Sequence, residues 1–403
     1  MLFIKMKKTK TNRIKKALSG AHAAAEAMRQ INPDVVAVYP ITPQTPIAMK
    51  FSEFVNDGLV NTEMIRVESE HSAMSACIGS AASGARTMTA TSANGLALMT
   101  EIVYIASSLR LPIVMNLVNR ALSGPINIHG DHSDAMLVRD SGWIMLASVN
   151  AQDVYENTIM AVRISEHKDI MLPVMVLQDG FITSHSVETL FTLDDKSVKN
   201  FVGEYKPKHN LLNTENPITI GPLDLFDYYF EHKRQQAEAM EKSKYIIKKI
   251  FNEFSKLSGR KYDYFEGYKT NDADFIILTM NSSVGTAMEV ADSFREKGFK
   301  TGVLSVRVFR PFMNEEVVKK LRNAKVVAVL DRAIAYGSHG GVLFNDVRSA
   351  FYEQQKKPKI LNYIYGLGGR ELSVDMVLKV FEDMIKLSKG KEIKQIQYLG
   401  VRD

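Results

Sequence analysis

The sequence has only one cysteine, Cys77, among its 403 residues. A single thiol cannot form a disulfide within the chain, and it cannot hold an iron–sulfur cluster or a cysteine-rich zinc site by itself. Without a disulfide framework, the sequence favours a reducing, cytoplasmic location. No apolar run approaches the roughly 18 residues that a membrane-spanning helix needs, so we expect no membrane contact.

Two common phosphate-binding signatures are also missing. No G-x-G-x-x-G run follows a predicted strand, and there is no P-loop. The glycine clusters at residues 337–341 and 366–369 have neither spacing. We expect both clusters to form tight turns at helix starts. An alternative for the first is a helix whose amides face an anion near Gly340.

The charge balance is basic, with 51 Lys and Arg residues against 45 Asp and Glu residues and a net charge of +6. Such a chain could bind nucleic acid or an acidic protein. Much of the excess lies in residues 1–16, which contain no acidic residue. These charges are not interleaved with aromatic side chains as in single-strand binding proteins. We therefore predict a basic N-terminal tail at 1–16 and no nucleic-acid site.

Short apolar runs alternate with helical stretches over residues 17–190 and again over residues 271–403. Such alternation is typical of α/β domains with a mainly parallel sheet. The intervening residues 191–270 begin with a polar stretch and continue with a charged, amphipathic pattern at 223–257. The sequence thus predicts two α/β domains joined by a linker and a long helical arm.

Reactive side chains follow three of the predicted strands. Thr42 lies in the proline-rich loop after strand 35–39, Glu70 follows strand 63–67, and Arg120 follows strand 112–118. In open parallel sheets, functional loops lie at the carboxyl ends of strands, so these residues are candidates for a site. Each also has a structural alternative. Thr42 could cap a helix, Glu70 could be an acid in a first helical turn, and Arg120 could form an ion pair in its own loop.

The loop after Arg120 is rich in potential ligands, with two histidines and two aspartates at residues 129–134. A metal site there is one alternative. Metal ligands usually need a scaffold that aims them together, and this run reads as an irregular loop. We favour hydrogen bonding within the loop and predict no metal on this chain.

Several of these segments together resemble the alpha subunits of the thiamine-diphosphate-dependent 2-oxoacid:ferredoxin oxidoreductases, and the pyruvate branch of that family in particular. In the first half of the chain they are YPITPQTP (39–46), VESEHSAMSA (67–76), TATSANGLALM (89–99), VNRALS (118–123), GDHSD (130–134) and DGFITSH (179–185). In the second half they are VRVFRP (306–311), LDR (330–332) and YGLGGR (365–370).

The resemblance implies an N-terminal domain that binds the pyrimidine ring of thiamine diphosphate and a C-terminal transketolase-C-like domain. It also implies that a beta subunit supplies the diphosphate and Mg²⁺ site and the nearest iron–sulfur cluster, while gamma and delta subunits carry electrons to ferredoxin. The reaction would be the reversible oxidative decarboxylation of pyruvate with CoA to acetyl-CoA and CO₂. The G-D-G…N signature for diphosphate and magnesium is absent here; residues 178–180 come nearest and lack the first glycine.

The same resemblance implies roles for single residues. Glu70 matches the carboxylate that hydrogen bonds ring nitrogen N1′ and favours the reactive imino form of the cofactor. Thr42 and Arg120 match the residues that hold the substrate carboxylate. Apolar walls of the cofactor cleft are expected from Ile41, Leu96 and Met99, with ordinary core packing as their alternative.

Three other functions remain open at this point. A related oxidoreductase could act on 2-oxoglutarate, a branched-chain 2-oxoacid, indolepyruvate or oxalate. A non-catalytic assembly subunit would need the α/β core but not Thr, Glu and Arg at strand ends. A self-contained thiamine enzyme is disfavoured by the missing diphosphate signature.

Overall fold

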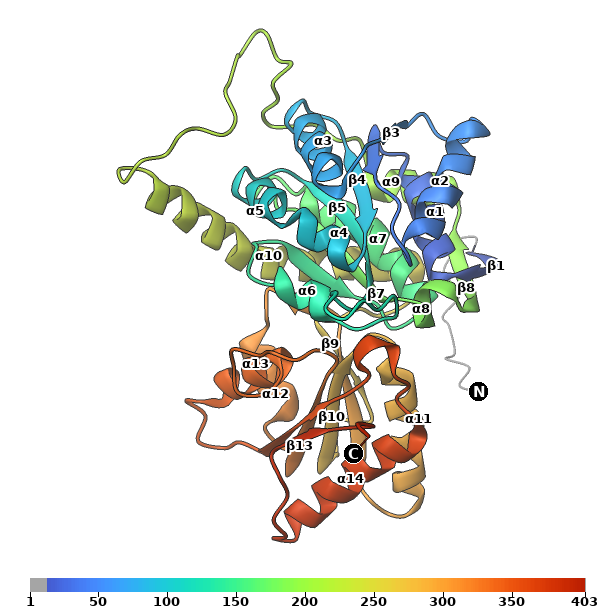
Figure 1. Cartoon of the computed structure of the whole chain (residues 1–403), viewed down its shortest axis with the longest axis vertical. Coiled ribbons are helices and arrows are strands. Elements are labelled where there is room, and N and C mark those ends of the chain that lie inside the picture. Colours follow the sequence, from blue (N-terminus) through green and yellow to red (C-terminus); the bar gives the residue numbers. More distant parts are fainter. Residues whose placement is uncertain (1–12, 403) are drawn as a thin grey trace.

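The computed structural model describes residues 13–402, which form two α/β domains stacked along the long axis of the molecule (Figure 1). Both predicted domains and their mainly parallel sheets are confirmed. Within the described residues, no helix combines the length and apolar character needed to cross a bilayer.

The first domain is built on a seven-stranded sheet of order β12-β6-β7-β5-β4-β2-β3. Its central strands are short and fully buried, as expected for parallel strands covered by helices on both faces. Neighbouring strands run parallel, except that β12 runs antiparallel to β6. The strands are β2 (Val35–Val38), β3 (Glu63–Arg66), β4 (Thr87–Thr91), β5 (Ile113–Asn119), β6 (Ile144–Ala147), β7 (Val174–Asp179) and β12 (Val308–Arg310).

Helices cover this sheet, and most begin just after a strand. Two of them, α4 and α5, are separated at Met99, whose backbone leaves helical geometry. The helices are α1 (Gly20–Ile31), α2 (Thr45–Asn56), α3 (Glu70–Ala82), α4 (Ala93–Leu98), α5 (Thr100–Ser108), α6 (Ser133–Leu137), α7 (Ala151–Ser165) and α8 (Ile182–His185).

The expected basic tail at 1–16 is wrong for its last four residues. Strand β1 (Arg13–Ser19) pairs antiparallel with β8 (Val187–Leu193). This pairing engages the β1 backbone along one side, and Lys16 forms an ion pair of 2.6 Å with Glu26 of α1. Residues 1–12 of the expected tail lie outside the described residues.

The expected linker and arm at 191–270 also differ in detail. Strand β8 continues to Leu193, helix α9 (Asp195–Val202) follows, and the chain is irregular over 203–228. The long helix α10 (Tyr229–Ser258) begins six residues later than expected. The start of the expected helix, residues 223–228, is a mainly exposed, irregular segment that directly follows Pro222. Strand β9 (Phe265–Tyr268) already belongs to the second sheet.

The second domain has a six-stranded sheet of order β15-β14-β13-β10-β11-β9. The short apolar run at 275–280 forms strand β10. The remaining elements are β10 (Phe275–Met280), α11 (Ser283–Glu296), β11 (Thr301–Val306), α12 (Asn314–Leu321), β13 (Val326–Asp331), α13 (Val342–Phe351), β14 (Lys359–Ile364), α14 (Val374–Ser388) and β15 (Ile396–Tyr398).

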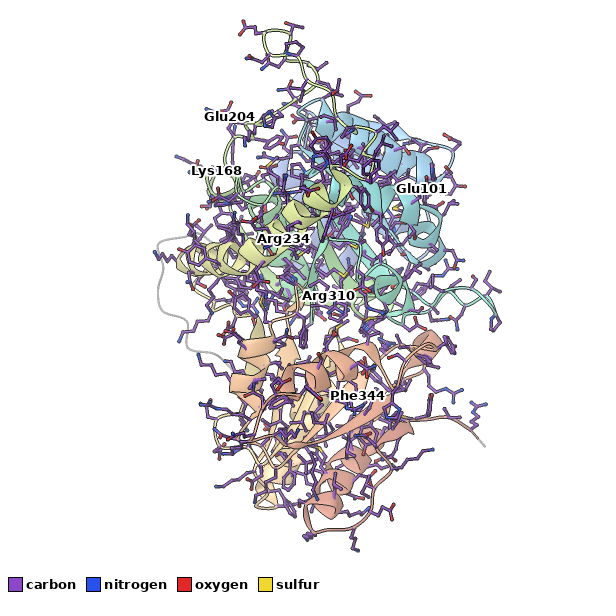
Figure 2. All side chains as sticks on the ribbon, turned by 90° about the vertical axis from the view of Figure 1, so that its left-hand side faces the viewer. Glu101, Lys168, Glu204, Arg234, Arg310 and Phe344 are labelled. Carbon is purple, nitrogen blue, oxygen red and sulfur yellow. The ribbon has the colours of Figure 1, made fainter. Side chains whose placement is uncertain are left out.

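The two domains share a strand and a buried ion network. Strand β12 leaves the second domain and forms the edge of the first sheet beside β6. One residue before it, Arg307 pairs with Asp153 of α7 at 3.0 Å and with Glu266 of β9 at 2.7 Å. Figure 2 shows the neighbouring Arg310 at the level where the domains meet. These contacts fix the relative position of the two sheets.

Candidate functional site

The carboxyl ends of β2, β4, β5 and β7 converge at one edge of the first sheet. Gly180, directly after β7, shows how closely they pack. A Cβ atom there would lie 2.5 Å from the carbonyl oxygen of Asn119 and 2.9 Å from Pro43 Cγ. The strand order therefore brings loops from distant parts of the sequence into contact.

Thr42 and Arg120 meet at this edge. Arg120 Nη1 donates a hydrogen bond of 2.8 Å to the carbonyl oxygen of Thr42, and its Nε donates one of 2.9 Å to the carbonyl oxygen of Asn127. The Thr42 side chain is exposed. The structure thus brings these two candidates into contact through the Thr42 backbone, and Thr42 is an exposed residue.

The Arg120 guanidinium is buried without an anion. Its residue is 7% exposed, and no carboxylate of residues 13–402 lies within ion-pair distance. The alternative of an ion pair with Asp131 or Asp134 is not what the structure shows. Asp134 accepts the backbone N–H of Arg120, and Asp131 is bonded to Ser133. A buried cation that lacks a counter-ion favours an anionic ligand.

Glu70 opens helix α3, behind the N-cap Ser69, where the helix dipole favours a negative charge. The residue is 7% exposed, and its carboxylate has no hydrogen-bond or ion-pair partner among the residues that the structure describes. Helix α4 lies directly against it, since a Cβ atom on Gly95 would be 2.7 Å from Glu70 Oε1. Only glycine at position 95 leaves room for this carboxylate.

Glu68, the other acid of this segment, has a different environment. It is exposed, and its carboxylate accepts a hydrogen bond from the Ser72 hydroxyl. That hydrogen bond lowers the pKa of the Glu68 carboxyl. Of the two acids, only Glu70 is buried with its carboxylate unengaged.

The three expected cleft walls differ from one another. Ile41 is half-buried beside Thr42. Leu96 and Met99 are 0% and 1% exposed and belong to the main hydrophobic core. Leu96 and Met99 are thus packed as ordinary core residues. Contact of Ile41, Leu96 and Met99 with a cofactor ring stays a prediction.

The histidine- and aspartate-rich loop is engaged in hydrogen bonds rather than arranged around a metal. Among residues 13–402, no group of His, Cys, Asp and Glu side chains has a metal-binding arrangement. His132 Nε2 lies 2.7 Å from Asp179 Oδ1, and Asp131 Oδ2 accepts the backbone N–H of Gly368 at 3.1 Å. Burial raises the pKa of the Asp134 carboxyl to about 6, with Asp131 adding to the shift.

Asp179 connects the two domains, and the sequence did not predict this contact. It accepts hydrogen bonds from Asn281 and Ser282 after β10, and it pairs with Arg332 after β13 at 2.9 Å. Burial alone raises its pKa, but Arg332 and His132 outweigh this and hold the pKa of Asp179 well below its usual range. No local pattern predicts it, because the partners come from two domains.

The two glycine clusters of the second domain are not open anion sites. Gly366 and Gly368 have positive φ and form a turn against the first domain. There, Asn127 Nδ2 donates a hydrogen bond of 3.0 Å to the carbonyl oxygen of Gly368. The expected helix start at 366–369 is therefore an interdomain turn. Near Gly340, the Asp331 carboxylate already accepts the first amides of α13, which leaves no support for a free anion site.

The fold is that of a two-domain α/β protein with mainly parallel sheets. The model of the pyruvate flavodoxin/ferredoxin oxidoreductase thiamine-diphosphate-binding domain matches residues 26–252, and that of pyruvate:ferredoxin oxidoreductase core domain II matches residues 273–377. The chain belongs to the pyruvate flavodoxin/ferredoxin oxidoreductase family.

Relatives match over almost the whole chain. Pyruvate synthase subunit PorA of Thermotoga maritima is 56% identical over 388 residues, which is 96% of this chain and 98% of the relative. The subunit of the same name from Methanocaldococcus jannaschii is 45% identical over 373 residues, 92% and 95% of the two chains. Ketoisovalerate oxidoreductase subunit VorA of Pyrococcus abyssi is 41% identical over 391 residues, 96% and 98%.

Solved structures agree on the fold. A 2-oxoglutarate:ferredoxin oxidoreductase from Magnetococcus marinus superimposes with a TM-score of 0.70 at 19% identity, over 93% of this chain and 66% of that one. A split-gene transketolase superimposes with a TM-score of 0.55 at 12% identity, over 93% of this chain and 100% of that one.

Proposed function

We propose that this chain is the alpha subunit of a pyruvate:ferredoxin oxidoreductase. The enzyme oxidises pyruvate with CoA to acetyl-CoA and CO₂, reversibly, and passes the electrons to ferredoxin. One observation carries the proposal: a buried carboxylate, Glu70, and a buried guanidinium, Arg120, lie at the same edge of the sheet, each without an ion-pair partner in the described chain.

The Glu70 environment fits the pyrimidine end of thiamine diphosphate. When bound, this cofactor supplies the electron sink for decarboxylation. The free carboxylate of Glu70 would hold a proton at ring nitrogen N1′, and Gly95 leaves the space beside it. The burial of Glu70 makes this hydrogen bond stronger than it would be in water.

Arg120 and Thr42 fit the substrate carboxylate. Two nitrogens of the guanidinium are fixed by backbone carbonyls, which sets its plane, while Nη2 has no hydrogen-bond partner among the described residues. A 2-oxoacid carboxylate would accept a bond from Nη2 and another from the exposed hydroxyl of Thr42. The reacting carbon would then be held at a fixed distance from the sheet edge.

The remaining parts of the enzyme would be on companion subunits. The sequence lacks the diphosphate signature and the cysteines for a cluster, and relatives are named as subunits. A beta subunit would supply the diphosphate and Mg²⁺ site and the nearest iron–sulfur cluster, and gamma and delta subunits would pass electrons to ferredoxin.

A second candidate substrate is a branched-chain 2-oxoacid, because a ketoisovalerate oxidoreductase subunit is 41% identical to the chain. The 56% identity to a pyruvate synthase subunit favours pyruvate. Rates of the assembled complex with pyruvate, 2-oxoisovalerate and 2-oxoglutarate distinguish the candidates, and pyruvate should give the highest kcat/KM.

The proposal is tested by Glu70→Gln in the complex assembled with its companion subunits. We expect pyruvate-dependent reduction of viologen to fall by about 10²- to 10⁴-fold, since the amide cannot hold the proton. Glu68→Gln is the matched control and should stay within a few fold of the wild type. Assembly is checked by size-exclusion chromatography. Wild-type turnover by the assembled Glu70→Gln complex would remove the proposed role.

A further inference from the structure

The Asp134 carboxylate joins the two sides of the site. It is 0% exposed and lies at the start of the short helix α6. Oδ1 accepts hydrogen bonds from Asn119 Nδ2 at 2.8 Å and from its neighbour Ala135 N at 2.7 Å. Oδ2 accepts the backbone N–H groups of Arg120 and Ala93, both at 3.0 Å. A single oxygen therefore connects the end of β5 to the start of α4.

The bond to Ala93 holds an unusual backbone conformation. Ala93 has φ of 40°, in the left-handed region that alanine rarely adopts. This residue begins α4, and Gly95, two residues later, lies against the Glu70 carboxylate. The position of Glu70's neighbouring helix thus depends on a backbone turn that Asp134 stabilises.

The hydrogen bond from the Arg120 backbone N–H to Asp134 acts on the Arg120 side of the site. It fixes the main chain from which the guanidinium extends, while Asn127 and Thr42 fix the guanidinium itself. We infer that Asp134 is a positioning residue that sets the spacing between the Glu70 side and the Arg120 side of the site. The inference rests on the proposed function, because it assigns Asp134 a part in the same reaction.

The chemistry of the donors requires a carboxylate here. Four N–H groups point at the two oxygens of Asp134, so an asparagine would turn its own NH₂ group toward two of them. Burial raises the pKa of this carboxyl to about 6, yet the four donors match the ionised form that predominates at neutral pH. A group that served packing alone would not need this full set of donors.

The test is Asp134→Asn in the assembled complex. Misplacing both sides of the site should raise KM for pyruvate and lower kcat, each by on the order of 10-fold or more. The control is Asp140→Asn, a carboxylate of the same region that pairs with Arg139 on the surface; this substitution should leave both constants unchanged. Unchanged KM and kcat in an assembled Asp134→Asn complex would overturn the inference.

A second substitution separates positioning from general loosening. Adding Ala93→Gly to Asp134→Asn should recover part of kcat but not KM, because glycine adopts a positive φ without help while the Arg120 bond stays lost. No recovery, or equal recovery of both constants, would contradict the inference.

If Asp134→Asn does not fold, Asn119→Ala provides a second test because it removes one donor to Oδ1 of Asp134. KM should then rise and kcat should fall by a few fold. Unchanged constants would again overturn the inference.

The outcomes distinguish the two proposals. No pyruvate-dependent viologen reduction by the assembled wild-type complex would refute the proposed function itself, whereas wild-type turnover by the Glu70→Gln complex would remove only the role of Glu70. An inactive Glu70→Gln complex together with an unaltered Asp134→Asn complex would refute only the positioning role.

Discussion

Two buried arginines of this molecule have opposite surroundings. Arg307 is 2% exposed, and its guanidinium bonds Asp153, Glu266 and Asn157. Arg120 is 7% exposed, and among residues 13–402 its guanidinium bonds two backbone carbonyls and no carboxylate. The first charge is compensated by carboxylates of the protein, whereas the second has no counter-ion among residues 13–402. Compensation, rather than burial alone, therefore separates a structural arginine from a candidate binding residue.

The pKa of Arg307 reflects this compensation. Burial alone would lower it, but Asp153 and Glu266 raise the pKa of the guanidinium well above its usual value. The partners come from α7 and β9, so the pairing links the two domains. The contrast with Arg120 can be tested by comparing stability with activity.

The largest effect on stability should come from Arg307→Ala. Removing this cation leaves buried carboxylate charge undercompensated, and we expect the free energy of unfolding to fall by about 3–5 kcal/mol. Urea unfolding followed by circular dichroism measures the change. A loss below about 1 kcal/mol would show that Arg260, which also pairs with Asp153, compensates on its own.

Arg120→Ala should show the opposite profile. We expect kcat/KM for pyruvate to fall about 100-fold, or about 2.7 kcal/mol, mainly through KM. Stability should change by less than about 1.5 kcal/mol, because the two lost hydrogen bonds are offset by removal of an unpaired buried cation. Steady-state kinetics and urea unfolding of the same preparation provide both values. A large loss of stability with unchanged KM would place Arg120 in the same class as Arg307.

The smallest effect should come from Lys50→Ala on the surface of α2. Lys50 pairs with Glu53 at 2.7 Å, and the two side chains are 36% and 57% exposed. Such pairs contribute less than about 0.5 kcal/mol, so neither unfolding nor turnover should change measurably. A clear loss of activity would indicate that this face of α2 contacts another subunit.

Much of the fold followed from the sequence because strands such as β10 are short apolar runs between clear turn signals. The same local signals placed Thr42, Glu70 and Arg120 at strand ends. What could not be read locally were contacts between distant segments. The pairing of β12 with β6 and the partners of Asp179 depend on how two domains meet, which no periodicity encodes.

The roles of Asp134 and Gly95 were missed for a related reason. Both lie in segments that mark the family resemblance, but spacing along the chain does not show that Asp134 reaches the amide of Ala93, 41 residues away. The predicted tail failed at residues 13–16 because the lysines of β1 can point outward while the backbone pairs with β8. The basic side chains of residues 13–16 indicated a tail, although their backbone forms a strand.

Strand β12, which follows β11 of the second domain but forms the edge of the first sheet, has a practical consequence for expression of the N-terminal half alone. A fragment that ends before residue 308 lacks β12 and leaves one side of β6 with unsatisfied amides and carbonyls. Exposed edges of this kind recruit other chains, so truncation between the halves should yield aggregates rather than a soluble module. The two halves should therefore be expressed together, because removing the second half exposes the edge of β6 that β12 covers.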